Sequence, residues 1–386
     1  MSSQNPRKRV GPRGHWNWGL AMGGHRALET IEFQLYSDRG LAGEIRTGLG
    51  PYQVLNLIAD QGSPTRARES LLLRVDRHFE VDVPLHIDDT EEEGYHGGDL
   101  SDEVAALLSL ALGWRIWAGG AVRTFRADDD PRGRPRAEWH QNRPPHLAPV
   151  RGTHRAPGPL NLNISGAKEL LATYPAVPSS KALALVRAAR LYQRSIWEVD
   201  SSPETAWIRM VSAIETAAGS WFEEEMPSPF AMLEASMPAV AGTLKKYGNE
   251  KVQRKVAERL SKISGATHKF RSFLREFLPP PPEARPSEHF QVPWNAKELV
   301  GRLMRIYHYR SRSLHAGTPF PMPLCVPPRV VDQSGVLEEC PSGIAAAGAD
   351  GMWLAEDMVM HFHTFEYIAR QALVAWWADL TSVPAE

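Results

Sequence analysis

The spacing of apolar residues changes about halfway along the chain, from a strand-like to a helix-like pattern. In the first half, IEFQLYS (31–37), SLLLRVD (70–76) and FEVDVPLHI (79–87) alternate apolar and polar residues or carry short apolar runs, and both patterns are typical of strands. The segment LSDEVAALLSLALGWRIW (100–117) has a serine and acidic residues at its start and then becomes apolar, which predicts a single buried helix. We therefore expect an α+β domain over residues 27–126.

Two segments beside this domain lack any apolar period. Residues 1–26 are rich in Gly, Arg and Trp, and we expect them to be irregular. Residues 127–165 are dense in Pro, Gly and Arg, which predicts a loop or linker with a domain boundary near its end. The acidic triplet at 128–130 is either a metal-binding cluster or a solvated turn, and the general weakness of so short a motif favours the turn.

Apolar residues recur at helical spacing through most of the second half of the chain. The helices that this spacing predicts cover residues 181–199, 203–219, 249–278, 295–315 and 352–380. Pro203 follows two serines, as at the start of a helix, and the prolines from Pro279 onward end the third of these helices because proline cannot continue it. The pattern predicts an all-α bundle over residues 166–386, with a Pro/Gly-rich loop inserted at 317–351.

The composition narrows the choice of partners and compartment. A formal net charge of −1 over 386 residues provides no overall positive field, so a nucleic acid would have to bind a local basic patch. The two cysteines, Cys325 and Cys340, are too few for a disulfide framework or a structural zinc site, which fits a reducing cytoplasm. The most apolar segment is interrupted by Arg115 and is too short to cross a bilayer, so we expect no membrane partner.

The stretch IYHYRSRSLHAGTPF (306–320) carries the strongest candidate chemistry. Leu299, Leu303 and Ile306 form the apolar stripe of the predicted helix, and Arg310 continues that stripe one turn later. An arginine is almost never buried without a partner or a function. The end of this helix is therefore where we look for a site.

Three polar residues at this helix end suit the cleavage of RNA. A neutral His315 can take the proton of the 2′-hydroxyl as general base, while Arg310 can hold the phosphate and stabilise the charge of the transition state. Ser311 can orient the imidazole. The chemistry needs no metal or other cofactor, and a second histidine from a two-fold related subunit can protonate the leaving group. Alternatively, Arg310 pairs with an acidic residue such as Glu215 and His315 caps the helix C-terminus, so that both are structural.

Two further groups of residues leave similar alternatives. Arg187, Arg190 and Arg194 share one helix face, which either binds the RNA backbone or is simply solvated. His361 falls on the apolar stripe of the last predicted helix and His363 points nearly opposite, so packing of His361 in the core is favoured over a shared metal.

The second half of the chain resembles the HEPN domain (higher eukaryotes and prokaryotes nucleotide-binding), specifically its Apea-like subgroup. YRSRSLHAG (309–317) is similar to the family's Arg-polar-x3-His motif at the end of a late helix, and ARLYQRSIWEVDSSPETAWIRMVSAIETAAG (189–219) is similar to its earlier helices. The resemblance covers about residues 180–380. It implies a helical bundle, usually dimeric, in which two Arg/His motifs meet in a cleft and Arg310 and His315 are catalytic.

The same resemblance assigns roles to three more residues. Ser311 occupies the polar position after the arginine, where many relatives have Asn or Asp. Glu215 falls where such domains often keep a polar residue on an early helix, and Arg312 contacts either phosphate or solvent. Many members look like metal-independent ribonucleases of toxin, abortive-infection or antiphage systems, which implies an RNA substrate. The N-terminal domain would then sense a trigger, bind a regulatory partner or restrain the activity.

Two functions therefore stand beside each other. The first is a metal-independent endoribonuclease that cleaves by 2′-hydroxyl attack, and the second is a catalytically inactive HEPN-like module for RNA binding or dimerisation. A weaker third interpretation is a metal-dependent enzyme that uses the acidic triplet at 128–130.

Overall fold

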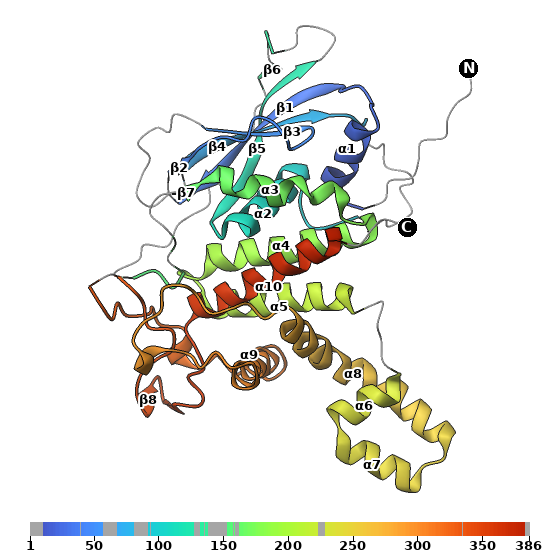
Figure 1. Ribbon diagram of the computed structural model, residues 1–386, viewed down its shortest axis with the longest axis vertical. Coiled ribbons are helices and arrows are strands. Elements are labelled where there is room, and N and C mark those ends of the chain that lie inside the picture. The colour runs from blue at the N-terminus through green and yellow to red at the C-terminus, as the bar shows by residue number, and fades with distance from the viewer. Residues whose placement is uncertain are drawn as a thin grey trace. The chain divides into compact units, whose positions relative to one another are not determined.

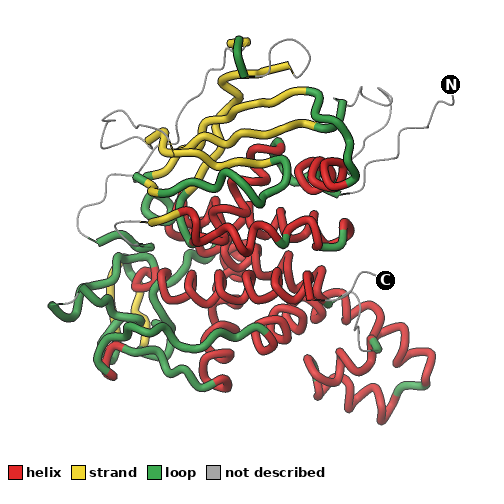
Figure 2. Tube along the Cα trace, turned by 45° about the horizontal axis from the view of Figure 1, so that its top comes forward, coloured by secondary structure: helices red, strands yellow, loops and turns green. Residues whose placement is uncertain are grey.

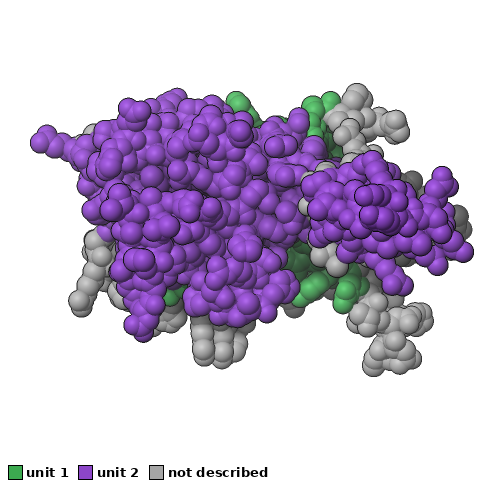
Figure 3. All heavy atoms as spheres, turned by 90° about the horizontal axis from the view of Figure 1, so that it is seen from below, with its two compact units in different colours: residues 1–151, 156–202, 374–386 green, residues 152–155, 203–373 purple. Residues whose placement is uncertain are grey.

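The computed structural model divides the chain into two compact units (Figure 3). Unit 1 comprises residues 1–151, 156–202 and 374–386, and unit 2 comprises residues 152–155 and 203–373. The residues that the structure describes are 11–38, 40–56, 68–80, 92, 94–126, 132–134, 136–137, 153–156, 158, 162–222, 228–333 and 335–382. The boundary predicted near residue 165 differs from the observed one, which lies at residues 202–203.

An antiparallel sheet is the centre of unit 1 (Figures 1 and 2). Its strands are β1 (Glu29–Ser37), β3 (Tyr52–Asn56), β4 (Arg68–Arg77), β5 (Ile116–Arg126) and β6 (Arg136–Ala137), in the order β3-β4-β1-β5-β6, and a separate parallel pair joins β2 (Leu41–Ala42) to β7 (Leu162–Asn163). The strands predicted at 31–37 and 70–76 are confirmed. Most of the strand predicted at 79–87 lies outside the described residues.

A buried carboxylate fixes the register of three strands. Glu32 on β1 lies opposite Arg74 on β4 and Arg123 on β5. Its side chain is fully buried and forms ion pairs with both arginines, at 2.6 Å in the case of Arg74. A slip of either strand by one residue would leave this charge unpaired in the sheet, which is strongly unfavourable.

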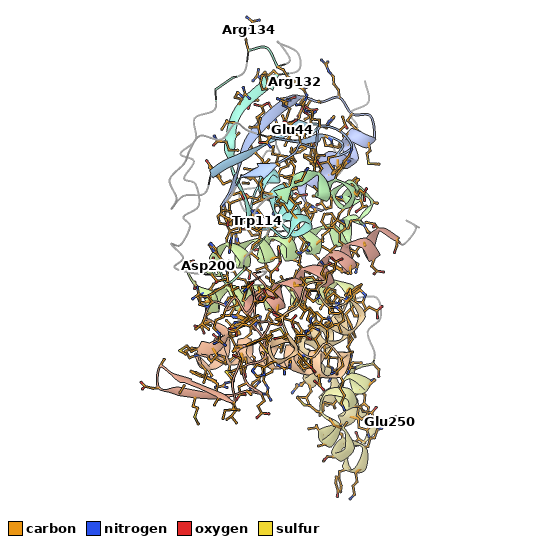
Figure 4. The ribbon with its side chains drawn as sticks, turned by 60° about the vertical axis from the view of Figure 1, so that its left-hand side comes forward. Glu44, Trp114, Arg132, Arg134, Asp200 and Glu250 are labelled. Carbon is orange, nitrogen blue, oxygen red and sulfur yellow. The ribbon has the colours of Figure 1, made fainter. Side chains whose placement is uncertain are left out.

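The helices of unit 1 are α1 (Arg13–Met22), α2 (Leu100–Leu112), α3 (Lys168–Ala172) and α4 (Ser179–Glu198), with short 3₁₀ turns at Ile164–Ala167 and Tyr174–Ala176. Helix α2 packs against both β5 and α4. Arg115 is buried in the turn between α2 and β5, and its Nε–H donates a hydrogen bond to the carbonyl of Ile196 at 2.6 Å. Its guanidinium also forms ion pairs with Asp38 and with Asp200, which is labelled in Figure 4. These contacts place α4 in unit 1, and they are the reason that the boundary falls after α4.

The prediction that residues 1–26 are irregular is wrong, because α1 occupies Arg13–Met22. Pro12 at its start provides no side-chain cap. Instead, Glu103 of α2 accepts hydrogen bonds from the backbone N–H groups of Gly14 at 2.8 Å and His15 at 2.9 Å. The carboxylate satisfies amide groups that every helix start leaves unpaired. A residue 88 positions away in the sequence therefore supplies the cap, and no local pattern announces it.

The single helix predicted over 100–117 is also wrong in its second part. Helix α2 ends at Leu112, where Gly113 adopts the left-handed conformation with φ 68°. Trp114 is then buried, and β5 begins at Ile116. The apolar run continues across the turn, so hydrophobicity alone does not show where the helix ends. Glycine after the last helical residue is the signal that marks it.

Helices make up most of unit 2. They are α5 (Pro203–Trp221), α6 (Pro229–Ser236), α7 (Pro238–Tyr247), α8 (Glu250–Glu276), α9 (Ala296–Ala316) and the first part of α10 (Phe362–Ser382), with 3₁₀ turns at Glu288–Phe290 and Met322–Leu324. Helix α8 packs against α5, α6, α7 and α9 (Figure 1). From residue 374 onward, α10 belongs to unit 1.

The helical character predicted for the C-terminal half is confirmed, with two corrections. Helices α6 and α7 fall in a segment for which no helix was predicted. The last helix begins at Phe362 and not at residue 352, because Ala345–Gly348 (β8) and Gly351–Leu354 (β9) form an antiparallel hairpin within the predicted loop and its border. Within the described residues, no helix combines the length and the hydrophobicity that a membrane crossing requires.

Candidate functional site

Helix α9 presents the predicted motif at its C-terminal end. The side chain of Asn295 caps its start by accepting a hydrogen bond from the backbone N–H of Glu298 at 2.9 Å. The stripe of Leu299, Leu303 and Ile306 is fully buried, as predicted. The helix ends at Gly317, whose φ of 62° closes the last turn in the left-handed conformation.

Arg310 continues this stripe and is held by a carboxylate from α5. Its Nη2 lies 2.7 Å from Oε2 of Glu215, and the two side chains are only 19% and 20% exposed. Burial raises the pKa of Glu215, while the nearby Arg310 and a hydrogen bond with Tyr307 act in the opposite direction. The Nε–H of Arg310 is buried and has no hydrogen-bond partner among the described residues. The pair that the sequence offered as an alternative is therefore present.

Tyr307 extends this pair into a polar cluster between three helices. Its hydroxyl takes part in hydrogen bonds with Glu215 of α5 and Thr267 of α8, and burial, followed by the negative charge of Glu215, raises its pKa. Its ring packs at 4.8 Å from that of Phe270, also on α8. Sequence analysis did not single out Tyr307, although it follows the buried Ile306 and precedes Arg310 by one helical turn.

The other residues of the motif lie on the outer side of the helix end. His315 and Arg312 are exposed, and Ser311 is half-buried. Five residues along an α-helix correspond to a rotation of about 140° and a rise of about 7.5 Å, so Arg310 and His315 leave the helix in different directions. The arrangement gives one fixed guanidinium and one accessible imidazole at the same helix end.

The segment after the motif is also fixed, through Glu204 at the start of α5. This carboxylate accepts hydrogen bonds from the hydroxyl of Ser313 at 3.0 Å and from the backbone N–H of Phe320 at 3.1 Å. Trp207, one turn further along α5, packs against the ring of Phe320 with a centroid distance of 5.9 Å. Sequence analysis missed Glu204, since no local pattern connects it to residues more than 100 positions away.

The arginines predicted to bind RNA on α4 do not form one exposed face. Arg190 is buried, with 5% of its surface exposed. It forms an ion pair with Asp102 at 3.2 Å and donates a hydrogen bond to the carbonyl of Gly97 at 2.8 Å. Arg187 donates to the carbonyl of Tyr95, and Arg194 is half-buried. The expectation of a solvated or RNA-binding face is thus corrected, because α2 and the loop before it cover part of α4.

His361 is buried, as predicted, and its Nε2 lies 3.1 Å from Oε1 of Glu338. The prediction that His363 points nearly opposite is wrong, because His361 precedes the helix; the two rings are stacked with centroids 6.2 Å apart. Burial lowers the pKa of His363 to about 3. Burial works against ionisation of Glu338, but its hydrogen bonds to His361 and Arg329 prevail and lower its pKa to about 2.

Metal and thiol chemistry receive little support from the described part of the chain. Among those residues, no cluster of three or more His, Cys, Asp or Glu side chains could hold a metal ion. The triplet at 128–130 lies outside them. Cys325 and Cys340 are both free, and burial raises the pKa of Cys325 to about 12, which keeps it protonated at neutral pH.

The structure defines a protein with an antiparallel α/β region in its N-terminal half and a helical C-terminal half. No protein-family model, no curated protein and no solved structure matches the chain.

Proposed function

We propose that unit 2 is a metal-independent endoribonuclease of the HEPN type, with Arg310 and His315 as its catalytic residues. His315 removes the proton of the 2′-hydroxyl, and the resulting alkoxide attacks the adjacent phosphorus. The bond to the 5′-oxygen of the next nucleotide breaks, and the products end in a 2′,3′-cyclic phosphate and a 5′-hydroxyl. Arg310 stabilises the negative charge that gathers on the phosphate oxygens.

One observation carries this proposal: a guanidinium held in place by Glu215 and an exposed imidazole lie on the last two turns of one helix. Preorganised donors lower the free energy of a transition state because they need no reorganisation when charge develops. The ion pair engages Nη2 of Arg310, whose Nε–H has no hydrogen-bond partner among the described residues, and Arg312 adds a second, exposed cation. Ser311 is placed between them in the sequence to orient the imidazole or the substrate.

A homodimer completes the proposed site. Cleavage needs an acid that protonates the leaving oxygen, and His315 of a second copy can provide it across a two-fold axis. The proposed setting is the cytoplasm, with a role in toxin action, abortive infection or antiphage defence. In this setting, unit 1 senses a trigger or binds a partner that raises the activity above a basal level.

The test is cleavage of a mixed RNA pool that includes tRNA, in the presence of EDTA. We expect the native chain to cut and His315→Ala to cut at least about 100-fold more slowly, which is the usual contribution of a general base. His308→Ala is the matched control, because His308 is an exposed histidine on the same helix. Equal cleavage by the native chain and His315→Ala would contradict the assignment, and loss of activity in EDTA would contradict its metal independence.

A second candidate function is a catalytically inactive module for RNA binding or dimerisation. The observation that favours it is the cluster of Arg310, Glu215 and Tyr307, which is what a purely structural arginine would form. In this case neither the native chain nor His315→Ala cuts RNA, and His315→Ala associates and binds RNA as the native chain does.

A further inference from the structure

Unit 2 contains a small helical arm with its own apolar core. The arm consists of α6, α7 and the N-terminal half of α8, over residues 229–260 (Figure 1), and it forms a lobe of unit 2 in Figure 3. Leu233, Ala241 and Ala257 are buried at its centre. Phe230, Met237, Leu244 and Leu260 pack around them. The apolar face of α8 in the arm is thereby covered by α6 and α7.

The opposite face of α8 is basic. Lys251, Lys255 and Arg259 follow one another at four-residue spacing and Arg254 lies three residues after Lys251, so the four share one side of the helix, and all four are exposed. We call these residues the basic stripe. They span about 12 Å along the helix axis at 1.5 Å per residue. The labelled Glu250 in Figure 4 marks the end of the arm at which the basic stripe begins.

The charge of the basic stripe is largely uncompensated. Arg254 has an ion pair with Glu258 at 3.8 Å, but among the described residues Lys251, Lys255 and Arg259 have none. The chain as a whole carries a formal charge of −1. A local excess of cations on such a background provides an electrostatic footprint for a polyanion.

An exposed aromatic residue of the arm lies just before the start of α8. Tyr247, the last residue of α7, is 76% exposed and is separated from α8 only by Gly248 and Asn249. Lys246 lies over its ring, 5.1 Å from the centroid. A cationic surface beside an exposed aromatic ring is the combination that proteins use to bind single-stranded nucleic acid, through phosphate contacts and base stacking.

We infer that the basic stripe, together with Tyr247, binds the phosphate backbone of single-stranded RNA. The inference rests on the proposed function for the choice of RNA among polyanions. A membrane surface fits less well, because an interfacial helix buries its apolar face in the lipid, and here α6 and α7 cover that face. The same helix continues to Thr267 and Phe270, which contact Tyr307 beside the candidate site. Helix α8 thus joins the RNA-binding surface to the proposed site of cleavage.

The test measures binding of a fluorescein-labelled oligouridylate by anisotropy over a series of salt concentrations. Every chain carries His315→Ala, so the probe is not cut. Lys251→Gln combined with Lys255→Gln should weaken binding about tenfold at 0.1 M salt, and the slope of log K against log salt should fall by about 0.7 for each phosphate that is no longer neutralised. Tyr247→Ala should weaken binding by about tenfold without changing that slope, since stacking carries no charge.

Lys168→Gln combined with Lys297→Gln is the matched control, because both lysines are exposed and the change in net charge is the same. Circular dichroism confirms that each variant keeps its helices. Equal affinity of the two double variants, or no binding of the probe by the parent chain, would overturn the inference. Binding to phosphatidylserine vesicles that the RNA probe fails to displace would also overturn it. Failure of the native chain to cleave, with stripe-dependent binding intact, would instead overturn only the proposed function.

Discussion

Arg310 illustrates how one side chain can be structural and chemically useful at once. Its ion pair with Glu215 offsets much of the desolvation free energy of a guanidinium whose side chain is only 19% exposed. The same ion pair holds the positive charge in one position. Burial raises the pKa of Glu215, so the folded protein holds this proton more tightly than the unfolded chain does. The carboxyl group therefore contributes most to stability at acid pH, and this contribution is lost as the pH rises through its raised pKa.

Arg310→Ala should lower the free energy of unfolding at pH 7 by about 3 kcal/mol, since it leaves a carboxylate that is mostly buried without its cation. The loss should shrink below the ordinary glutamate pKa of 4.5, where Glu215 is mostly neutral in both the folded and the unfolded state. Denaturant unfolding at pH 7 and pH 4 measures both effects. Arg312→Ala, on the exposed side of the same helix, should change stability by no more than about 0.5 kcal/mol. A cost as small for Arg310→Ala would contradict the structural role of the pair.

At the level of secondary-structure elements, helix α1 depends on a carboxylate that the sequence does not place beside it. Gly14 is where the chain approaches Glu103 most closely: an added Cβ would lie 2.5 Å from its Oε1. At Gly19 on the same helix, no atom other than the neighbouring backbone of α1 lies within 4 Å of the corresponding position. A side chain at position 14 would therefore collide with Glu103, whereas a side chain at position 19 would not, and the two glycines form a matched pair for testing this contact.

Gly14→Ala should destabilise the protein by about 2 kcal/mol, because either α1 or Glu103 must move and the two cap hydrogen bonds weaken. Gly19→Ala should instead stabilise it by about 0.5 to 1 kcal/mol, since alanine favours a helix interior more than glycine does. Thermal unfolding of both variants by circular dichroism tests the pair. Equal effects of the same sign would mean that Glu103 does not cap α1.

Elements with a clear period could be predicted from the sequence, and elements that depend on distant partners could not. The amphipathic pattern identified β1, α5 and α9 within a few residues, because their apolar residues are spaced regularly, and α9 also has local caps at Asn295 and Gly317. The same reasoning failed for α1, which is capped from α2, and for the end of α2, where the apolar run continues into β5. It also extended α10 over β9, whose residues are equally apolar.

The candidate site likewise has some features that could be predicted from the sequence and others that depend on distant contacts. The position of Arg310 on a buried stripe and the end of α9 at Gly317 follow from spacing alone. The cluster with Tyr307 and the anchoring by Glu204 depend on how α5, α8 and α9 pack, and the exposure of the basic stripe depends on α6 and α7. A single sequence contains no signal for such contacts between distant segments.

At the level of the whole molecule, unit 1 depends on the last residues of the chain. Trp376 and Trp377 on α10 are fully buried, and the ring of Trp377 meets that of Tyr174 edge to face at 6.2 Å.

Trp377→Ala should lower the free energy of unfolding by about 3 to 5 kcal/mol, as expected for the loss of a fully buried aromatic side chain. Hydrogen exchange should show the loss of protection in β1 and β4, which are more than 290 residues away in sequence. Asp379→Ala, exposed on the same helix, is the control, and equal protection in both variants would contradict this dependence.

The division of α10 between the two units has a consequence for biosynthesis. Unit 1 contains the sheet strands, which are synthesised before unit 2, and also residues 374–386, which are synthesised after it. At about 5–20 residues per second, its sheet must wait roughly 12–50 s for the helix that completes it. Unit 2 has all of its residues by position 373 and can fold first. If unit 1 restrains the proposed ribonuclease, each newly made chain passes through a short period in which the nuclease is complete before its restraint.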